Sequence, residues 1–441
     1  MLIEFTIGNF KSFRDKTTFS MIAANLTSED PALDTNNVIP TSKNLSLLKS
    51  AAVYGANASG KSNLGTALRF MREMIVMSAR EDVTPAQAGL EPFLLDRESR
   101  AQPSFFEIVF LLDKRQYRYG FEVDKLQIVS EWLFHVPRTK EAALFVRDGR
   151  EFDVRAGYKE GRGLESKTRN EALFLSVTAL FNGEIAQKIL KWVRAFAVET
   201  GLQDDRFRRF TMACLRHPER KARLLHFIRS LDLGIGEMDA GEVPSLDMLP
   251  GELPDETKHQ IIEEFSQRIF VVHRTREPLE TPEDIEVFDL DKHESQGTRK
   301  LVAMAGPLWS ILSYGNILFV DELDARLHPL MTRRIIEMFH SPLTNPNGAQ
   351  LIFATHDTNL LDKTLFRRDQ IWFAEKDRQG ATHLASLAEY RVRSDAAFEK
   401  QYLEGRYGAI PFLGDLSRLP WAQKREDVQD VEAAEREPVH A

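Results

Sequence analysis

The sequence predicts an α/β protein whose core is assembled from the two ends of the chain. Three patterns predict it: a strand–loop–helix unit over residues 47–77, a strand-rich stretch over 104–135, and helices alternating with short apolar strands from 296 to 375. The chain has 441 residues, 43% of them hydrophobic and 28% charged. It therefore holds enough apolar material for a large α/β core with an insertion.

Composition narrows the class of protein. The single cysteine, Cys214, excludes an intrachain disulfide and a thiolate metal cluster, which is typical of a reducing cytosol. The net charge of −8 argues against a uniformly basic surface for binding nucleic acid, but it does not exclude a local basic patch. We find no apolar run of the ~18–20 residues that a membrane span needs and no basic signal-peptide start, so we expect a cytoplasmic protein without membrane contact.

The N-terminal part reads as strands followed by a helix. Short alternating or apolar runs predict strands at 2–7, 17–22 and 47–53, and helical spacing predicts a helix from Lys61 to about Met77. Period-two alternation then predicts a β-meander with runs at 105–110, 117–123 and 128–134.

The middle of the chain looks mainly helical, with helices expected at 184–197 and 219–231. Residues 204–229 are rich in Arg and Lys and residues 232–264 are rich in Asp and Glu, which predicts either a basic ligand surface or two faces that pair with each other. Buried parallel strands are expected at 317–320, 351–354 and 371–374. We expect the chain to divide into four parts. These are an N-terminal lobe (1–140), a mainly helical insertion (141–270), a C-terminal lobe (271–415) and a charged tail (416–441).

A phosphate-binding loop lies between the third strand and its helix. Residues 55–62 fit G-x-x-x-x-G-K-[ST] at every fixed position. Small residues let backbone N–H groups converge on an anion, the lysine reaches the β- and γ-phosphates, and the last hydroxyl serves Mg²⁺. The motif predicts a nucleoside triphosphate and Mg²⁺ as ligands. Its candidate binding residues are Gly55, Asn57, Ala58, Ser59, Gly60, Lys61, Ser62 and Asn63.

Two carboxylates follow the apolar run 317–320. A carboxylate just past a parallel strand beside a phosphate loop can hold Mg²⁺, and a second can polarise the attacking water. We assign Asp321, with Ser62, to the metal and Glu322 to the water. A solvated Asp-Glu at a strand end is the plainer alternative.

Two further segments carry polar groups at element ends. Ser295, Gly297 and Thr298 open a helix, either as an anion-binding turn or simply as a capped helix start. His356 follows the 351–354 strand, where it can contact a γ-phosphate or its attacking water, or serve a structural role.

The ordered set of motifs resembles the ABC-type ATPases of the SMC, RecF and OLD group, and in particular stand-alone bacterial ATPases of AAA-15 or AAA-21 type. Glu294-Ser295-Gln296-Gly297-Thr298, the segment 321–329 with its Leu-His-Pro ending, and the opening Asn9-Phe10-Lys11-Ser12-Phe13 carry the resemblance. It implies an ABC-type P-loop ATPase head with Lys11 and Ser12 near the nucleotide. It also implies a homodimer in which Ser295 and Gly297 close on the partner's ATP.

The sequence departs from ordinary ABC proteins in two ways. It lacks Leu-Ser-Gly-Gly-Gln, and His328 stands where those proteins have a later Asp. The glutamine loop stays open, with Gln87 and Gln102 as candidates.

Three functions compete on this resemblance. The first is a phage-defence ATPase that controls a separate effector, for example a Toprim-type nuclease. The second is a RecF- or SMC-like repair ATPase that clamps DNA, with 204–229 as its basic surface. The third, an OLD-like fusion, needs an Asp-x-Asp metal motif, and the 85 residues after His356 contain none.

Overall fold

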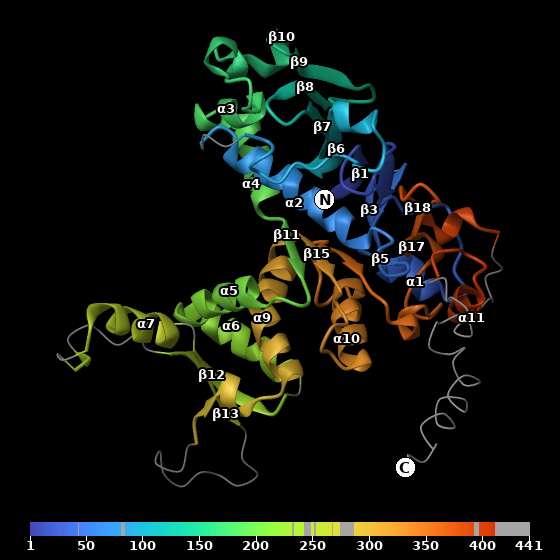
Figure 1. Cartoon of the computed structure of the whole chain (residues 1–441). Helices are drawn as coiled ribbons and strands as arrows, with labels where there is room; N and C mark the ends of the chain where they lie inside the picture. The colour runs from blue at the N-terminus through green and yellow to red at the C-terminus, as the bar shows by residue number, and fades with distance from the viewer. Residues whose placement is uncertain are drawn as a thin grey trace, which may run out of the picture.

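The computed structural model describes residues 1–42, 44–80, 84–231, 233–241, 248–250, 253–266, 268–273, 286–391 and 397–410. It confirms the α/β class (Figure 1). The expected tail 416–441 lies outside the described residues. No described helix is both long enough and apolar enough to span a bilayer.

A seven-stranded antiparallel sheet forms the N-terminal lobe, in the order β10-β9-β8-β7-β6-β1-β2. The predicted meander is confirmed in it. The strands are β1 (Leu2–Gly8), β2 (Thr17–Ser20), β6 (Ser104–Leu112), β7 (Arg115–Val123), β8 (Ile128–His135), β9 (Ala142–Asp148) and β10 (Glu151–Val154).

A six-stranded sheet forms the core, in the order β11-β15-β16-β5-β17-β18, parallel except for the β17–β18 hairpin. Its strands are β5 (Ser50–Tyr54), β11 (Ala197–Thr200), β15 (Ile317–Asp321), β16 (Gln350–Ala354), β17 (Ile371–Lys376) and β18 (Thr382–Ser386). Smaller sheets join β3 (Val38–Ser42) to β4 (Leu45–Leu48), and β12 (Ile235–Ala240) to β13 (Ile269–His273) and β14 (Phe288–Asp289).

The helices cover both faces of the core sheet and extend beyond it. In chain order they are α1 (Pro31–Asn36), α2 (Lys61–Met77), α3 (Phe174–Leu180), α4 (Glu184–Arg194), α5 (Asp205–Leu215), α6 (Pro218–Ser230), α7 (Asp255–Ser266), α8 (Leu290–His293), α9 (Gln296–Tyr314), α10 (Pro329–His340) and α11 (Phe398–Leu403). In Figure 1 the meander and the α5–α7 region lie at opposite ends of the molecule, with the core sheet between them.

The core strands bury both of their faces. Along β15, Phe319 packs in the cluster that contains α2, whereas Leu318 and Val320 pack in the cluster that contains α9 and α10. Successive side chains of a strand point to opposite faces, so one apolar run feeds two cores. This explains why the sequence shows continuous apolar runs here rather than alternation.

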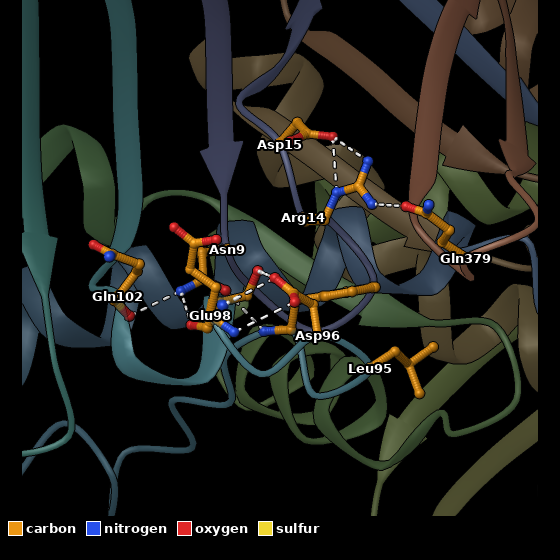
Figure 2. Close-up of a pocket in the computed structure, with 10 residues that line it drawn as sticks. Asn9, Arg14, Asp15, Leu95, Asp96, Glu98, Gln102 and Gln379 are labelled. Carbon is orange, nitrogen blue, oxygen red and sulfur yellow. Dashed lines mark hydrogen bonds and ion pairs between the residues drawn. The ribbon is translucent and has the colours of Figure 1, made fainter.

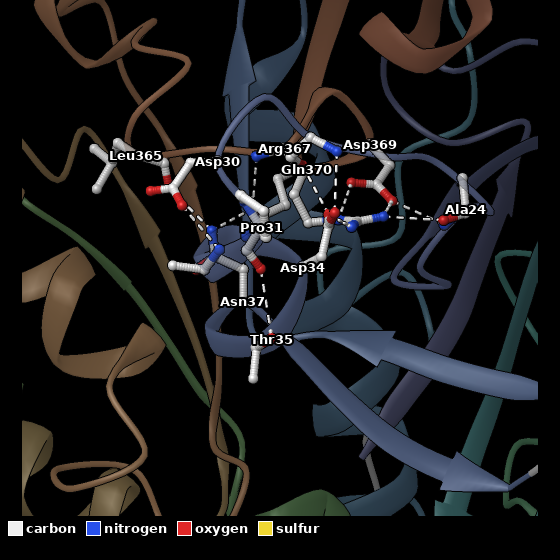
Figure 3. Close-up of polar contacts among 12 residues, drawn as sticks. Ala24, Asp30, Pro31, Asp34, Thr35, Asn37, Leu365, Arg367, Asp369 and Gln370 are labelled. Atoms are coloured by element: carbon white, nitrogen blue, oxygen red, sulfur yellow. Dashed lines mark hydrogen bonds and ion pairs between the residues drawn. The ribbon is translucent and has the colours of Figure 1, made fainter. Parts of the chain in front are cut away.

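Two segments far apart in sequence, residues 24–37 and 365–370, are hydrogen-bonded to each other (Figure 3). Arg367 donates to both carboxylate oxygens of Asp369 at 3.0 and 2.8 Å, to the carbonyl of Ala24 at 2.9 Å, and to Asp34. Asn37 donates to Gln370 at 2.8 Å. A charged group is tolerated when buried if it is paired and hydrogen-bonded, as Arg367 is.

The structure differs from the sequence prediction inside 141–270. Strands β9 and β10 continue the N-terminal sheet, so the boundary expected at 140 falls within a sheet. The helix expected to reach 197 ends at Arg194, and Ala197–Thr200 instead forms β11. The physical reason is pairing: β11 lies parallel to β15, with Val198 opposite Phe319, and Val198 is buried in the core.

The apolar run 47–53 is also split. It forms β4 and β5, separated by the buried Lys49, whose ammonium donates to the carbonyl of His340 at 2.9 Å.

Candidate functional site

The candidate site lies where the parallel core strands end. Val53 of β5 is paired with Ala354 of β16, and Phe353 of β16 with Val320 of β15. Because the strands run parallel, their carboxyl ends meet at one edge of the sheet, where open α/β sheets bind ligands. This edge brings together the phosphate loop, the acidic pair and the segment that carries His356.

The phosphate loop turns sharply between β5 and α2. Ala58 has a φ of 62° and Gly60 a φ of 106°, and helix α2 begins at Lys61 as predicted. A Cβ on Gly60 would lie 2.1 Å from Thr382 Oγ1, so only glycine fits. Asn57 and Ala58 are exposed at the tip, and Ser62 is exposed on the first turn of α2. The hydroxyl of Ser59 is buried and finds no hydrogen-bond partner among the described residues.

Lys61 folds back over its own loop. Its ammonium donates to the carbonyls of Gly55 at 2.8 Å and Ala56 at 3.0 Å, and the residue is buried. Burial lowers the pKa of Lys61, and the carboxylates of Asp321, Glu322 and Asp324 oppose that shift. These carboxylates therefore act on Lys61 across the site, although the phosphate loop and the acidic pair lie far apart in sequence.

Ser12 lies directly against the phosphate loop. Asn63 donates to the Ser12 hydroxyl at 2.7 Å, and Thr382 Oγ1 lies 2.8 Å from the same hydroxyl and 2.7 Å from the carbonyl of Ser59. The N-terminal turn and the β17–β18 hairpin thus brace the loop from both chain ends. Lys11, predicted to bind nucleotide, forms an ion pair with Glu91 at 2.9 Å.

The acidic pair fits a hard divalent cation. One oxygen of Asp321, Oδ1, is buried without a hydrogen-bond partner in the described part of the chain, and an oxygen of Asp324 three residues later is in the same condition. A buried, unpaired carboxylate oxygen is costly unless an ion or ligand completes it. Glu322 has a φ of 55°, an uncommon value that departs from the strand geometry of the residues before it.

His356 is exposed at the end of the β16 segment. Partial burial and the Lys61 charge lower its pKa, while Asp324, Glu322 and Asp321 act in the opposite direction. A lowered pKa favours the neutral imidazole at pH 7, which can accept or donate a hydrogen bond.

Ser295 caps helix α9, as the sequence predicted. Its hydroxyl accepts from the Thr298 amide at 3.2 Å and lies 2.9 Å from the Thr298 hydroxyl. A Cβ on Gly297 would lie 3.1 Å from the carbonyl of Arg326, so this turn packs against the loop that follows the acidic pair. Ser295 itself is exposed, so a second molecule could reach it.

Sequence reasoning missed the strand that flanks the acidic pair. In β11, Thr200 lies opposite Asp321, and the Gly201 amide donates to the Asp321 carbonyl at 2.6 Å. The exposed Gln203 follows at this edge. The two glutamine candidates lie elsewhere: Gln87 accepts from Thr84, and Gln102 lines a pocket with Asn9. The available signal was the short run 196–198, which ends before a Thr-Gly pair.

That pocket, of about 670 Å³, lies between the N-terminal turn and the 377–380 hairpin (Figure 2). Three carboxylates line it, from Asp15, Asp96 and Glu98, against the single guanidinium of Arg14. An acidic lining repels an anionic ligand, so this hollow is a poor candidate for phosphate binding.

Comparison with known proteins identifies a family for this chain. A family model described as "AAA domain, putative AbiEii toxin, Type IV TA system" matches residues 50–362, and no curated protein matches the sequence. The SMC head domain from Thermotoga maritima is 13% identical, with a TM-score of 0.38, covering 87% of this chain and 98% of that one. The Smc head with coiled coil and joint from Pyrococcus yayanosii is 13% identical, with a TM-score of 0.36, covering 92% and 99%. The matched region includes both the phosphate loop and the acidic pair, and the chain belongs to this AAA-21 family.

Proposed function

We propose that this protein is a Mg²⁺-dependent ATP-binding and ATP-hydrolysing switch that works as a nucleotide-sandwich homodimer. One observation supports the proposal best. The carboxyl ends of β5, β15 and β16 lie together at the phosphate loop, and the carboxylates of Asp321 and Glu322 interact electrostatically with Lys61 of that loop. Phosphoryl transfer needs positioning and charge stabilisation more than covalent chemistry. A preformed edge of this kind supplies both.

Each residue has a proposed role. Backbone amides of the loop and the start of α2 bind the phosphates, and Lys61 exchanges its two carbonyl acceptors for phosphate oxygens. Ser62 and the unpaired oxygen of Asp321 would hold Mg²⁺, which supplies charge neutralisation on the phosphates when bound. Glu322 accepts a proton from the attacking water, and the neutral His356 orients that water or the γ-phosphate.

The dimer follows from the position of the Ser295 turn. The turn packs against the loop after its own acidic pair, and its hydroxyl side is exposed. A helix start with free N–H groups favours an anion. We infer that the turn closes on ATP held by a second copy, so that ATP binding joins two subunits.

The output we favour is control of a separately encoded effector in bacterial phage defence. The family description, which names a toxin and a type IV TA system, supports a role beside a second gene product. A Toprim-type nuclease is one effector that would fit.

A DNA-clamping ATPase is the second candidate. The basic stretch 204–229 supports it weakly, because Arg208 makes a bidentate ion pair with Asp291 at 2.6 and 2.5 Å and Lys221 pairs with Asp239. A groove of about 450 Å³, lined mainly by α4 together with Ala179 of α3 and Arg80, is a better candidate surface. Its charged residues are Arg80, Lys188, Lys191 and Arg194 against Glu184.

The decisive experiment is Glu322→Gln, assayed for ATP turnover and for ATP-dependent dimerisation by size-exclusion chromatography with light scattering. We expect turnover to fall by about 10²- to 10⁴-fold, as for loss of a general base, with a stable ATP-bound dimer. Glu337→Gln, an acid of α10 that pairs with Arg333, is the matched control and should behave like the parent. Parental turnover in Glu322→Gln would remove the assigned base.

DNA binding separates the two outputs. Fluorescence anisotropy with duplex DNA at physiological salt should show no ATP-dependent binding if the protein controls an effector. Tight binding that Lys191→Glu weakens and that strengthens at low salt would favour the clamp instead.

A further inference from the structure

Lys300 is a buried cation in the second turn of α9. The residue has no exposed surface, although it lies among polar loops rather than in the apolar core. Its ammonium donates to the carbonyl of Leu323 at 3.1 Å and to that of Ala325. Both carbonyls belong to the loop that directly follows the acidic pair, so one side chain fixes two points of this loop.

The space around the ammonium is tightly closed. A Cβ on Gly201 would lie 2.8 Å from Lys300 Nζ and 2.0 Å from the Glu322 carbonyl. Burial lowers the pKa of Lys300 to about 8, while Asp204, Asp324 and Glu322 act to raise it and Arg326 to lower it. Asp204 and Asp324 each have a buried oxygen that no described residue hydrogen-bonds, and the Lys300 ammonium supplies charge that balances them.

The same helix carries the Ser295 turn. Ser295 caps α9, and Gly297 lies against the Arg326 carbonyl at the far end of the loop held by Lys300. The first turns of α9 and residues 322–326 therefore form one packed unit. If the start of α9 moves, residues 322–326 must move with it or the Lys300 hydrogen bonds must break, because packed interiors are not continuously deformable.

We propose that Lys300 is the positioning residue that couples the two nucleotide sites of the dimer. This inference rests on the composite site proposed above. In each subunit the Ser295 turn serves the partner's nucleotide and Glu322 serves the subunit's own. When the Ser295 turn closes on the partner's nucleotide, Lys300 transmits that movement to Glu322 at the subunit's own nucleotide.

Lys300→Met tests the positioning role, because methionine keeps most of the length of the side chain but cannot donate. We expect kcat to fall by about 10- to 100-fold, the cost of a misplacement near 1 Å, while the Kd for a fluorescent ATP analogue stays within about twofold. Lys292→Met, at an exposed lysine of α8, is the matched control. Equal loss of binding and turnover, or parental kcat, would overturn the role.

Gly201→Ala would place a Cβ against both the Glu322 carbonyl and Lys300 Nζ, so it displaces the loop that Lys300 holds while leaving the charge in place, and it decides the question if Lys300→Met does not fold. It should also lower kcat with binding kept. Parental kcat in a folded Gly201→Ala protein would contradict the proposal.

Mixed dimers test the coupling itself. Mixing Lys61→Ala with Ser295→Arg subunits leaves one intact composite site, and activity of this reference mixture tests the proposed function alone. We then add Lys300→Met to either subunit in turn. Loss of at least about 10-fold in both mixtures supports coupling. Loss in only one mixture, or in neither, overturns it, and an inactive reference mixture overturns the composite site together with the coupling.

Discussion

We predict that the buried histidine His340 makes the stability of the protein sensitive to acid. It ends α10 beneath β5, where its Nε2 lies 2.7 Å from the Ser50 hydroxyl and its ring packs edge-on against Phe366. Burial, reinforced by the Lys49 ammonium, lowers the pKa of His340 from 6.5 to about 3. The folded protein therefore holds the neutral imidazole far below the pH at which the unfolded chain takes up a proton.

The size of the effect follows from this shift. Because the folded pKa lies below the unfolded one, the contribution is complete above pH 6.5 and is lost as the pH falls from 6.5 toward 3. One pH unit inside this window is worth about 1.4 kcal/mol. Between pH 7 and pH 5 His340 alone should remove about 2 kcal/mol from the free energy of unfolding.

His340→Phe keeps an aromatic ring and removes the titration. Urea unfolding at pH 7, 6 and 5 gives the slope of the free energy of unfolding against pH for the parent and for the variant. Subtracting one slope from the other cancels the contribution of all other titratable groups. The variant should lose stability at pH 7, because Ser50 loses a partner, yet it should fall less steeply below pH 6.5. His226→Phe, at an exposed histidine of α6, is the matched control. Parallel curves for parent and His340→Phe would refute the reasoning.

Three substitutions test the site and the lobe above it. Gly60→Ala should abolish binding of a fluorescent ATP analogue, because the added Cβ collides with Thr382. Gly163→Ala, at a φ of 81° in open space, is the control and should leave binding intact. Equal effects of the two variants would contradict the requirement for glycine at position 60. Asp321→Ala should remove the tightening of ATP binding by Mg²⁺ but keep binding in EDTA, measured by calorimetry. Arg147→Met should cost about 3–5 kcal/mol in urea unfolding, since Glu131 then lies buried without its cation, and a cost below about 1 kcal/mol would contradict that.

The phosphate loop and the strand that carries the acidic pair could be predicted because their geometry is local. The spacing from Gly55 to Ser62 fixes the turn, and α2 begins at Lys61 as predicted. The apolar run before Asp321 forms β15, because a strand buried on both faces uses such a run. That these segments meet at one sheet edge follows from parallel pairing, which the alternation of helix and strand predicts.

The supporting residues could not be predicted, because their neighbours lie far away in sequence. Thr382 reaches the phosphate loop from a hairpin near the other end of the chain. Lys300 looks like an ordinary helix lysine, and three converging segments bury it. Strand β11 is short and includes a glutamate and a threonine, so its partner β15, far along the chain, decides its conformation.

The position of β11 changes how the middle of the chain relates to the nucleotide site. The chain leaves the N-terminal lobe through α4, pairs with the acidic strand as β11, and continues into α5. Thr211 of α5 then bonds to α9, donating to the Ala303 carbonyl at 2.7 Å and accepting from the Gly306 amide at 3.0 Å. Residues 197–215 are thus bonded both to the strand that ends in Asp321 and to the helix that Ser295 caps. A displacement of α5 would therefore act on both β15 and α9, because β11 pairs with β15 and buried hydrogen bonds join α5 to α9.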